Sequence, residues 1–588
     1  MKKEISNKDL YILGLFHSAS DPSVALIKNG EVLYFAEEER FLRNKHAKGY
    51  FPLHALEFVL NEEKIKLEEV DAIVQPWDVH KYDRGHIQDH FNKINEQYKT
   101  SDHDLEYQNA LINQFKKSKQ VGIIKQNLKK EYGDIDMPDI RFVNHHLAHA
   151  CTAFYNSGFK DSLVLSIDGS GEEVTTSWWI GNEDRLNLLR EIKVPHSLGW
   201  FYSAFTEYLG FDAYNGEYKV MGLAAYGKFD KSIKSRIDQL VWYDGEGGFL
   251  TNPLLLSRGP RSYSYYFPDI LAEHVGKPPR AGSGPIEQWH RDCAYSVQCR
   301  LEEIVLEMLQ YWIRNTGLKT LCISGGVGLN VKMNGNIYCS GIVDDLFVYP
   351  LCSDAGSSIG AAMAFYYEMN GLNNKELSCI NYGPCFTDEE ILELLGSCQI
   401  AFSIEDEIEK EVAQLISEGH VVGWFQGRME GGPRALGARS ILADPRNIES
   451  RDKVNAVIKY REPWRPFCPS MTEEGAKRYF NKWKKSPFMI MTFQTNETAE
   501  KEVPAIVHVD HTARPQIVDS VSNPRFYKLI EAFNEITGIP VLLNTSFNIK
   551  GEPIVCNPHD AIRTFYSTGL DVLAMGNCLI RKDKWKEF

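Results

Sequence analysis

The sequence predicts an α/β protein whose N-terminal part consists of two similar halves. Three strand-like segments open the chain, YILGLFHS, VALIKNG and EVLYFAEEER, and Asn29-Gly30 between the last two is a strong hairpin signal. About 150 residues later, SLVLSIDGSG, TTSWWIG and RLNLLREI repeat the pattern. Apolar residues at three- and four-residue steps follow each copy, in PLHALEFVLNEEK and SLGWFYSAFTEYLG, and predict helices. Two such halves that face a common cleft account for this repetition.

A turn of small and polar residues ends the first strand of each half. These turns read His17-Ser18-Ala19-Ser20 and Asp168-Gly169-Ser170-Gly171. A third turn, in TLCISGGVGLN, places Gly325, Gly326 and Asn330 between a strand and a helix, where backbone N–H groups can meet a phosphate. Glycine-rich turns also join strands in α/β proteins without such a ligand. Together the three turns favour a nucleotide site in the cleft, as in the group of actin, sugar kinases and Hsp70.

The composition limits the classes of function. A chain of 588 residues is too long for one hydrophobic core, and we expect roughly two to four domains. The net charge of −14 disfavours a nucleic-acid partner. The 12 cysteines form no CxxC pair, which disfavours a zinc ribbon, and we expect reduced thiols. Because no apolar stretch predicts a signal peptide or a membrane span, we expect a cytoplasmic protein without a membrane partner.

Three histidines lie within five positions in the segment VNHHLAHA. A strand followed by a helix is predicted here, with Asn144 as the N-cap. His145 and His149 are four residues apart and share one helix face, the spacing by which a helix offers two imidazoles to one metal ion. His146 points about 100° away. The alternative is that these histidines are hydrogen-bonded parts of the core.

A metal site needs at least one further ligand. The segment PLCSDAGSSIGAAMAF supplies Asp354 in a predicted turn between the strand DDLFVYPL and a helix of small residues. Two histidines and one carboxylate with open positions suit Fe(II) or Zn(II), and the sequence does not choose between them.

Basic residues gather in the last third of the chain. Between Arg428 and Arg465, nine basic residues accompany five acidic ones. The segment WFQGRMEGGPRALGARSILADPRN mixes arginine with glycine, so guanidinium groups and backbone amides could surround a phosphate of a substrate or of ATP. The alternative is a solvated helical face. The glycines, prolines and aromatic residues of GGPRALG and REPWRPFCPS favour site loops.

A domain boundary is predicted at about residues 370–384. The segment NGLNNKELSCINYGP is polar and rich in glycine and asparagine, and it follows a predicted helix. Beyond it we expect a helix in TDEEILELLGS and strands in VVGWF, PAIVHV and PVLLNT.

A series of motifs extends in one order over nearly the whole chain: EEERFLRNKH, NHHLAHA, SIDGSGE, GEYKVMGLAAYG, ISGGVGLN, SDAGSSIGAA, GRMEGGPRALGARSIL, YREPWRPFCPS, DHTARPQ and LLNTSFN. The series resembles the O-carbamoyltransferases of natural-product and nodulation-factor biosynthesis. The resemblance implies a Kae1-like carbamoyl-transfer domain of duplicated, ribonuclease H-like (actin-like) fold over residues 1–372. It also implies a YrdC-like α/β domain over residues 373–588.

The resemblance further implies a two-step reaction. The C-terminal domain converts ATP, with Mg(II), and carbamoyl phosphate into carbamoyl adenylate. The N-terminal domain then transfers the carbamoyl group to a hydroxyl of a small-molecule acceptor. The sequence does not identify the acceptor. It is also compatible with an oligomer.

The resemblance assigns roles to individual residues. It implies that Fe(II), or another divalent metal, is bound by His145, His149 and Asp354. His17 falls where the family has an active-site histidine, and we hypothesise that it is the base; Lys45 is a further nucleotide contact. The remaining ATP, carbamoyl phosphate and adenylate contacts are Asp168, Gly169, Gly325, Gly326, Asn330, Arg434, Lys459, Arg465, Arg514, Asn544 and Ser546.

One departure and three alternatives accompany this assignment. Ser18 follows His17, where family members commonly have an aspartate, and Asp21 comes three residues later. A tRNA threonylcarbamoyl-type enzyme would share both half-folds, but the acidic chain disfavours a tRNA partner. A small-molecule kinase of the actin-like group would leave the histidine pair and the C-terminal domain unexplained. A nucleotide-binding regulator without catalysis would bind ATP but not turn it over.

Overall fold

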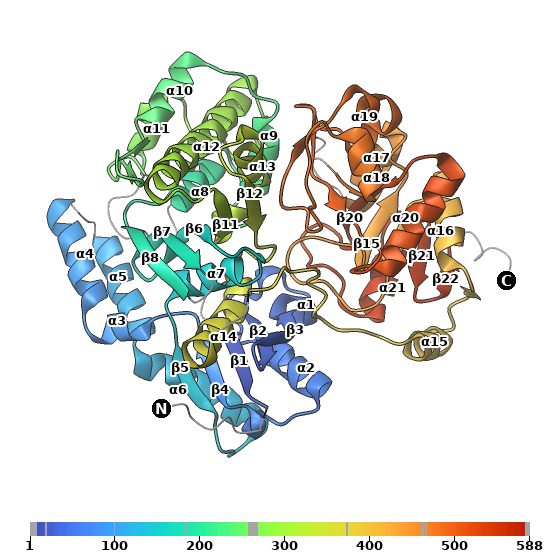
Figure 1. The fold of residues 1–588 in the computed structure, drawn as a ribbon, viewed down its shortest axis with the longest axis horizontal. Coiled ribbons are helices and arrows are strands. Elements are labelled where there is room, and N and C mark those ends of the chain that lie inside the picture. Colours follow the sequence, from blue (N-terminus) through green and yellow to red (C-terminus); the bar gives the residue numbers. More distant parts are fainter. Residues whose placement is uncertain are drawn as a thin grey trace.

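Two five-stranded sheets with the same topology form the N-terminal part of the protein (Figure 1). The computed structural model describes residues 9–17, 20–98, 100, 102–182, 185–256, 268–371, 374–459, 464 and 467–582. The first sheet has the strand order β3 (Glu31–Glu37), β2 (Ser23–Lys28), β1 (Tyr11–Phe16), β4 (Ala72–Gln75), β5 (Asp139–Phe142). The second has the order β8 (Arg185–Lys193), β7 (Val174–Asn182), β6 (Ser162–Gly171), β11 (Thr320–Ser324), β12 (Asp345–Val348).

The pairing directions of the two sheets also agree. In each sheet the first three strands in sequence are antiparallel neighbours, and the last two are added in parallel. The predicted hairpin between β2 and β3 is present, and Asn29 and Gly30 both have the positive φ that its turn requires, 52° and 88°. The predicted duplication is therefore confirmed, and with it the actin-like α/β fold class.

Two helices lie between the sheets and exchange partners. α7 (His145–Phe154) follows the first sheet but packs on β6 and β11 of the second. α14 (Asp354–Asn370) follows the second sheet but packs on β1, β2 and β4 of the first, and also on α7. The two helices can approach closely because α14 presents small residues. A Cβ added at Gly360 would clash with the backbone of Ala148 in α7.

The remaining helices of the N-terminal part surround this centre. The predicted cap is present: Asn144 accepts a hydrogen bond from the first turn of α7, and the structure adds Ser197, which caps the helix Leu198–Tyr208 in the same way. The other helices and the small hairpin are α1 (Glu38–Leu42), α2 (Leu53–Glu63), α3 (Val79–Asp83), α4 (His86–Gln97), α5 (Asp102–Gln114), α6 (Lys117–Tyr132), α8 (Leu198–Tyr208), α9 (Glu217–Ala224), α10 (Lys231–Asp238), β9 (Val241–Tyr243), β10 (Phe249–Thr251), α11 (Ile270–Val275), α12 (Gln288–Thr316) and α13 (Val331–Ser340).

A third sheet, with eight strands, forms the C-terminal part. Its order is β13 (Ser403–Ile404), β22 (Cys578–Arg581), β21 (Val572–Met575), β14 (Val422–Phe425), β15 (Arg439–Ala443), β20 (Val541–Ser546), β16 (Cys468–Met471), β19 (Gln516–Ile517). Around it lie α15 (Asp388–Ser397), α16 (Ile408–Ser417), α17 (Ile448–Val454), α18 (Glu473–Tyr479), β17 (Phe493–Gln494), α19 (Glu497–Glu502), β18 (Thr512–Ala513), α20 (Pro524–Thr537) and α21 (Pro558–Tyr566).

One strand prediction in this part is wrong. The segment PAIVHV contains a single 3-10 turn, Pro504–Ile506, instead of a strand. Pro504 has no backbone N–H and occupies the first position of this turn, where that loss costs nothing. The apolar side chains of Ala505 and Ile506 are buried without any sheet pairing of their backbone. The helix in TDEEILELLGS and the strands in VVGWF and PVLLNT are present, as α15, β14 and β20.

No helix in the described part of the chain combines the length and the apolar character needed to cross a membrane.

The contact between α7 and α14 can be tested with two glycine substitutions. Gly360→Ala is expected to lower the free energy of unfolding by about 1–3 kcal/mol, because the added methyl group meets backbone that has no room to move. Gly122, in the middle of α6, faces open space. Gly122→Ala is therefore expected to raise the free energy of unfolding by about 0.5–1 kcal/mol through helix propensity alone. Urea denaturation measures both changes. Equal effects of the two substitutions would contradict the tight contact.

Candidate metal centre and shared chamber

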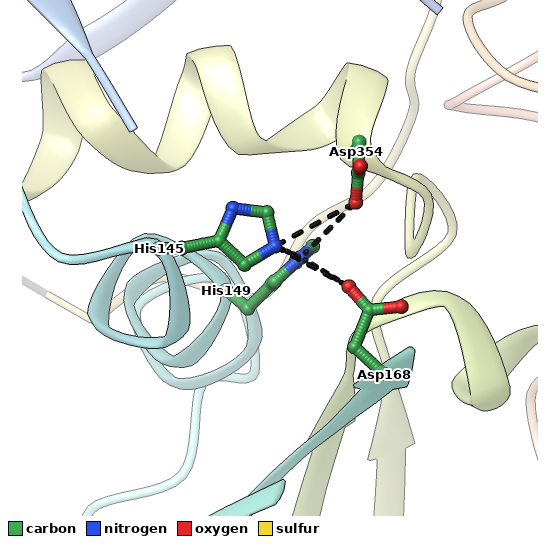
Figure 2. Close-up of side chains that lie close together, drawn as sticks. All are labelled: His145, His149, Asp168 and Asp354. Carbon is green, nitrogen blue, oxygen red and sulfur yellow. Dashed lines mark hydrogen bonds and ion pairs between the residues drawn. The ribbon is translucent and has the colours of Figure 1, made fainter. Parts of the chain in front are cut away.

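Four side chains from three elements meet at the cleft between the two halves (Figure 2). His145 and His149 project from α7, Asp168 lies near the end of β6, and Asp354 is the first residue of α14. The Nε2 atoms of the two histidines are 3.1 Å apart. They lie 3.3 and 3.5 Å from Asp168 Oδ2, and 3.6 and 3.8 Å from Asp354 Oδ1. The structure thus brings together the three predicted ligands and adds Asp168.

These separations suit one bound cation. In a tetrahedral site, metal–ligand distances of about 2.1 Å give ligand–ligand separations of about 3.4 Å. The donor set is two imidazole nitrogens and two carboxylate oxygens, which fits Fe(II) or Zn(II). The family resemblance implied a nucleotide contact for Asp168. Its other oxygen, Oδ1, accepts hydrogen bonds from the backbone N–H groups of Gly169 (2.7 Å) and Gly326 (3.3 Å), so this residue joins the candidate metal group to both glycine turns.

Opposite charges offset the cost of burial in this group. Burial lowers the pKa of His145, but the hydrogen bond to Asp168 and the charge of Asp354 raise it by more. The net result is a pKa of about 9. Burial raises the pKa of Asp168, but the two histidines hold it well below its usual value. Burial and the charge of Asp168 raise the pKa of Asp354. Without a cation the group retains protons, and a bound cation would replace them.

Glu172 fixes the start of α7. Its Oε1 accepts hydrogen bonds from the backbone N–H groups of Asp78 (2.6 Å) and His145 (3.2 Å), and its Oε2 accepts one from the Asn144 side chain (3.1 Å). The nearby His146 turns away from the group, as its helical position predicts. Its ring nitrogens contact Ser166 Oγ at 2.8 Å and a backbone oxygen of β7 at 3.0 Å, which is a structural role.

The third predicted turn approaches the same cleft. Gly325 has a φ of 89°, and a Cβ there would clash with the backbone of Ile167, so this position requires glycine. The Asn330 side chain caps α13 through the Met333 N–H and exchanges hydrogen bonds with Gln298. Its amide is therefore engaged within the fold.

A cavity of about 470 Å³, here called the shared chamber, lies between the N-terminal and C-terminal parts. Among the described residues, eight lysine and arginine side chains line it, against five aspartate and glutamate side chains, although the whole chain is strongly acidic. Ser353, next to Asp354, lines it too, so the chamber reaches the start of α14, although the four candidate metal ligands are not among its lining residues. The predicted contacts that line it are Lys45, Arg434, Lys459, Arg514, Asn544 and Ser546.

The cations of the C-terminal part are held in place by nearby groups. The Lys459 ammonium donates to Asn548 Oδ1 at 2.7 Å and contacts Ser546. The Arg434 guanidinium lies over the ring of Tyr218 in α9, 4.8 Å from its centre. The Arg514 guanidinium contacts Cys468 Sγ at 2.7 Å. These are arginine and lysine side chains directed at one small volume, which is the arrangement that binds phosphate groups.

Some predicted residues lie elsewhere. Arg465 is outside the described residues. Of the other arginines in the basic stretch, Arg439 is fully buried and donates to backbone carbonyls, and Arg446 pairs with Asp444. His17 is buried beside the ring of Phe51, and burial lowers the pKa of His17 to about 3.

A buried ion pair joins the two parts of the chain at the chamber wall. Arg40 in α1 donates to Glu37 at 2.7 Å and to the Gly432 carbonyl at 2.6 Å. The same Glu37 carboxylate accepts the Gly432 N–H at 3.0 Å. Because all three groups are buried, this contact fixes the loop GGPRALG against the first half.

Sequence reasoning missed several residues of the chamber wall. Tyr218 belongs to the motif GEYKVMGLAAYG, but nothing in its sequence context indicates that it contacts Arg434. Asp21, Glu39 and His46 gather at the same wall. The position of His46 directly after Lys45 in RNKH is the signal that could have drawn attention to it.

Comparison with known proteins gives matches over most of the chain. Residues 11–363 match the family described as carbamoyltransferase N-terminus, and residues 413–582 match the one described as carbamoyltransferase C-terminus. Nodulation protein NolO of Bradyrhizobium diazoefficiens is 40% identical over 75% of this chain and 79% of its own. Nodulation protein NolNO of Sinorhizobium fredii is 34% identical over 96% and 79%. Full-length HypF in its phosphate- and nucleotide-bound form aligns over 63% of this chain and 57% of its own, with 12% identity and a TM-score of 0.33.

The candidate metal centre predicts a difference between two histidines of one helix. His149→Ala is expected to abolish stoichiometric binding of Fe(II), because a donor 3.1–3.8 Å from the three others is lost. His146→Gln is expected to retain the metal, since the His146 ring faces Ser166 instead. Anaerobic loading followed by elemental analysis measures the metal content of each protein. Loss of metal in both variants, or in neither, would count against the four-residue group.

Proposed function

The chain belongs to the carbamoyltransferase family, and from this premise we propose that it is an ATP-dependent O-carbamoyltransferase acting on a hydroxyl of a small molecule. Residues 1–372 would form the Kae1-like transfer domain, and residues 373–588 the YrdC-like domain that makes carbamoyl adenylate. The separation of the sheets supports this division, because every strand of the first two sheets precedes residue 349 and every strand of the third follows residue 402.

The first step would take place at the C-terminal wall of the shared chamber. One water cleaves carbamoyl phosphate to carbamate and phosphate, and a carbamate oxygen then attacks the α-phosphorus of ATP, with pyrophosphate leaving. The substrates and products are polyanions. Arg434, Lys459 and Arg514 stand where they can neutralise these charges, and the positive surplus of the chamber concentrates anions there.

The second step would take place where the chamber reaches the first two sheets. The acceptor oxygen attacks the carbamoyl carbon, and the bond from this carbon to the AMP phosphate oxygen breaks. The backbone at Gly325 and Gly326 lets the nucleotide approach closely, and Lys45 lies within reach of its charge. A divalent cation at His145, His149, Asp168 and Asp354, expected to be Fe(II), would supply a Lewis acid for the carbonyl and phosphate oxygens.

The observation that carries this proposal is the continuity of the shared chamber. A single cavity joins the cations of the C-terminal part to Ser353, the neighbour of Asp354. An adenylate made at one end can therefore reach the start of α14, where Asp354 follows Ser353. A kinase of the actin-like group would have no use for the C-terminal cations.

The proposal predicts that pyrophosphate appears only when both ATP and carbamoyl phosphate are present. Arg514→Met is expected to slow its release about 10²–10³-fold, because a cation that meets phosphate oxygens is removed. Arg478→Met is a matched control, since Arg478 pairs with Glu502 outside the chamber, and this variant should keep the wild-type rate.

His149→Ala should retain pyrophosphate release while losing transfer. Release of labelled pyrophosphate from ATP labelled at its γ-phosphate measures the first step, and mass spectrometry of a panel of hydroxyl compounds measures the second. Formation of ADP in place of AMP and pyrophosphate would indicate a kinase.

A further inference from the structure

An aspartate and a histidine form a rigid pair at the wall of the shared chamber. His46 Nδ1 lies 2.7 Å from Asp21 Oδ1, and the Asp21 N–H donates to the His46 carbonyl at 2.9 Å. The His46 N–H in turn donates to Glu39 Oε2 at 2.7 Å. Asp21 and His46 both have left-handed backbone, with φ of 63° and 66°. Such conformations cost free energy in residues other than glycine, and they persist where the surrounding contacts fix them, often at functional sites.

Asp21 sets the orientation of the His46 ring and leaves one ring nitrogen without a hydrogen-bond partner among the described residues. The Asp21 carboxylate accepts only a proton on Nδ1, so it selects the tautomer that has the lone pair on Nε2. Nε2 is buried and has no hydrogen-bond partner among the described residues, whereas the His46 side chain as a whole is partly exposed and lines the chamber. Burial lowers the pKa of His46, but Asp21 and Glu39 outweigh burial and the charge of Lys45 and raise it above its usual value. The pair thus has the geometry and the basicity of a proton acceptor.

This pair is connected to the start of α14, where Asp354 lies, through Ser23. Ser23, two residues after Asp21, donates through its hydroxyl to the carbonyl of Ala355 at 2.7 Å. Ala355 follows Asp354 directly, and Ser353 on the other side lines the same chamber as His46. The start of β2, two residues after Asp21, is therefore fixed against the start of α14. The proposal places the acceptor in the chamber, between His46 and Ser353.

His17 is less suited to accept the proton. Its side chain is buried, and it is not among the described residues that line the chamber. With its pKa lowered to about 3, it holds a proton poorly at neutral pH. His17 instead packs against Phe51 at the start of the turn that leads to Asp21.

We propose that His46, oriented by Asp21, is the general base that takes the proton from the acceptor hydroxyl. This assignment rests on the proposed function. The hydroxyl proton passes to His46 Nε2 while the oxygen forms its bond to the carbamoyl carbon. The bond from that carbon to the phosphate oxygen breaks, and AMP leaves with the electron pair. The products are the carbamate ester, AMP and protonated His46, which then releases its proton to solvent.

The test compares an alcohol, which needs a base to attack the carbamoyl carbon, with hydroxylamine, which does not. The full chain, loaded with Fe(II), receives ATP and carbamoyl phosphate with ethylene glycol or with hydroxylamine as the probe. Hydroxylamine attacks as a neutral molecule and needs little help from a base. His46→Gln is expected to slow formation of the glycol carbamate about 10²–10⁴-fold. It is expected to leave hydroxyurea formation and pyrophosphate release near the wild-type rates. Asp21→Asn, which loses the tautomer selection, should slow the glycol reaction roughly tenfold or more.

A second histidine and carboxylate pair provides the control. His54 Nδ1 lies 2.6 Å from Glu38 Oε1, but the His54 side chain is 54% exposed and lies outside the chamber. His54→Gln should therefore react like the wild type with both probes. If the glycol is not a substrate, AMP release in the absence of acceptor, in which water is the nucleophile, is compared among the same variants.

Different outcomes would overturn the role of His46 and the proposed function. Equal losses with glycol, or with water, and with hydroxylamine would assign His46 a structural role and overturn the proposal. Wild-type rates with the alcohol or water in His46→Gln would do the same. Absence of pyrophosphate in the wild type would instead overturn the proposed function itself.

Discussion

The contact between α7 and α14 is the constraint on which the site depends. Each helix leaves one sheet and packs on the other, and the two helices begin at the same point of the cleft. The close approach at Gly360 brings Asp354, at the start of α14, against His145 and His149 in α7. Asp168 reaches the same point from β6. A wider spacing of the helices would separate the four donors by more than one cation can span.

The shared chamber depends on a second contact, between the two parts of the chain. Arg40 and Glu37 hold the loop at Gly432 through buried hydrogen bonds, and Tyr218 in α9 lies against Arg434. Removal of one member of such a buried pair costs about 3–5 kcal/mol, so this interface resists opening. The N-terminal part thus contributes to the wall around the phosphate-binding cations.

Sequence patterns predicted what depends on local order. The duplicated strands and the helix after Asn144 follow from hairpin, capping and periodicity signals, and the four-residue spacing of two histidines follows from helix geometry. The presence of Asp168 beside Asp354 could not be predicted, because it depends on where two strand ends meet in space. The pairing of Asp21 with His46 depends on left-handed backbone at both residues, which neither side chain indicates. One apolar segment of the C-terminal part was mistaken for a strand because hydrophobicity alone does not specify pairing.

The central claim is that the carbamoyl group passes through an adenylate that is made and consumed in the shared chamber. It is tested most directly with carbamoyl phosphate labelled with oxygen-18 at its carbonyl. The label enters one of the two equivalent oxygens of carbamate, so attack on the α-phosphorus places labelled oxygen between the carbamoyl carbon and phosphorus in about half of the adenylate. Attack of the acceptor at carbon then leaves this bridging oxygen on AMP. Mass spectrometry should find oxygen-18 in about half of the AMP and in about half of the carbamate ester. AMP without the label, together with a labelled carbamate ester, would contradict the account.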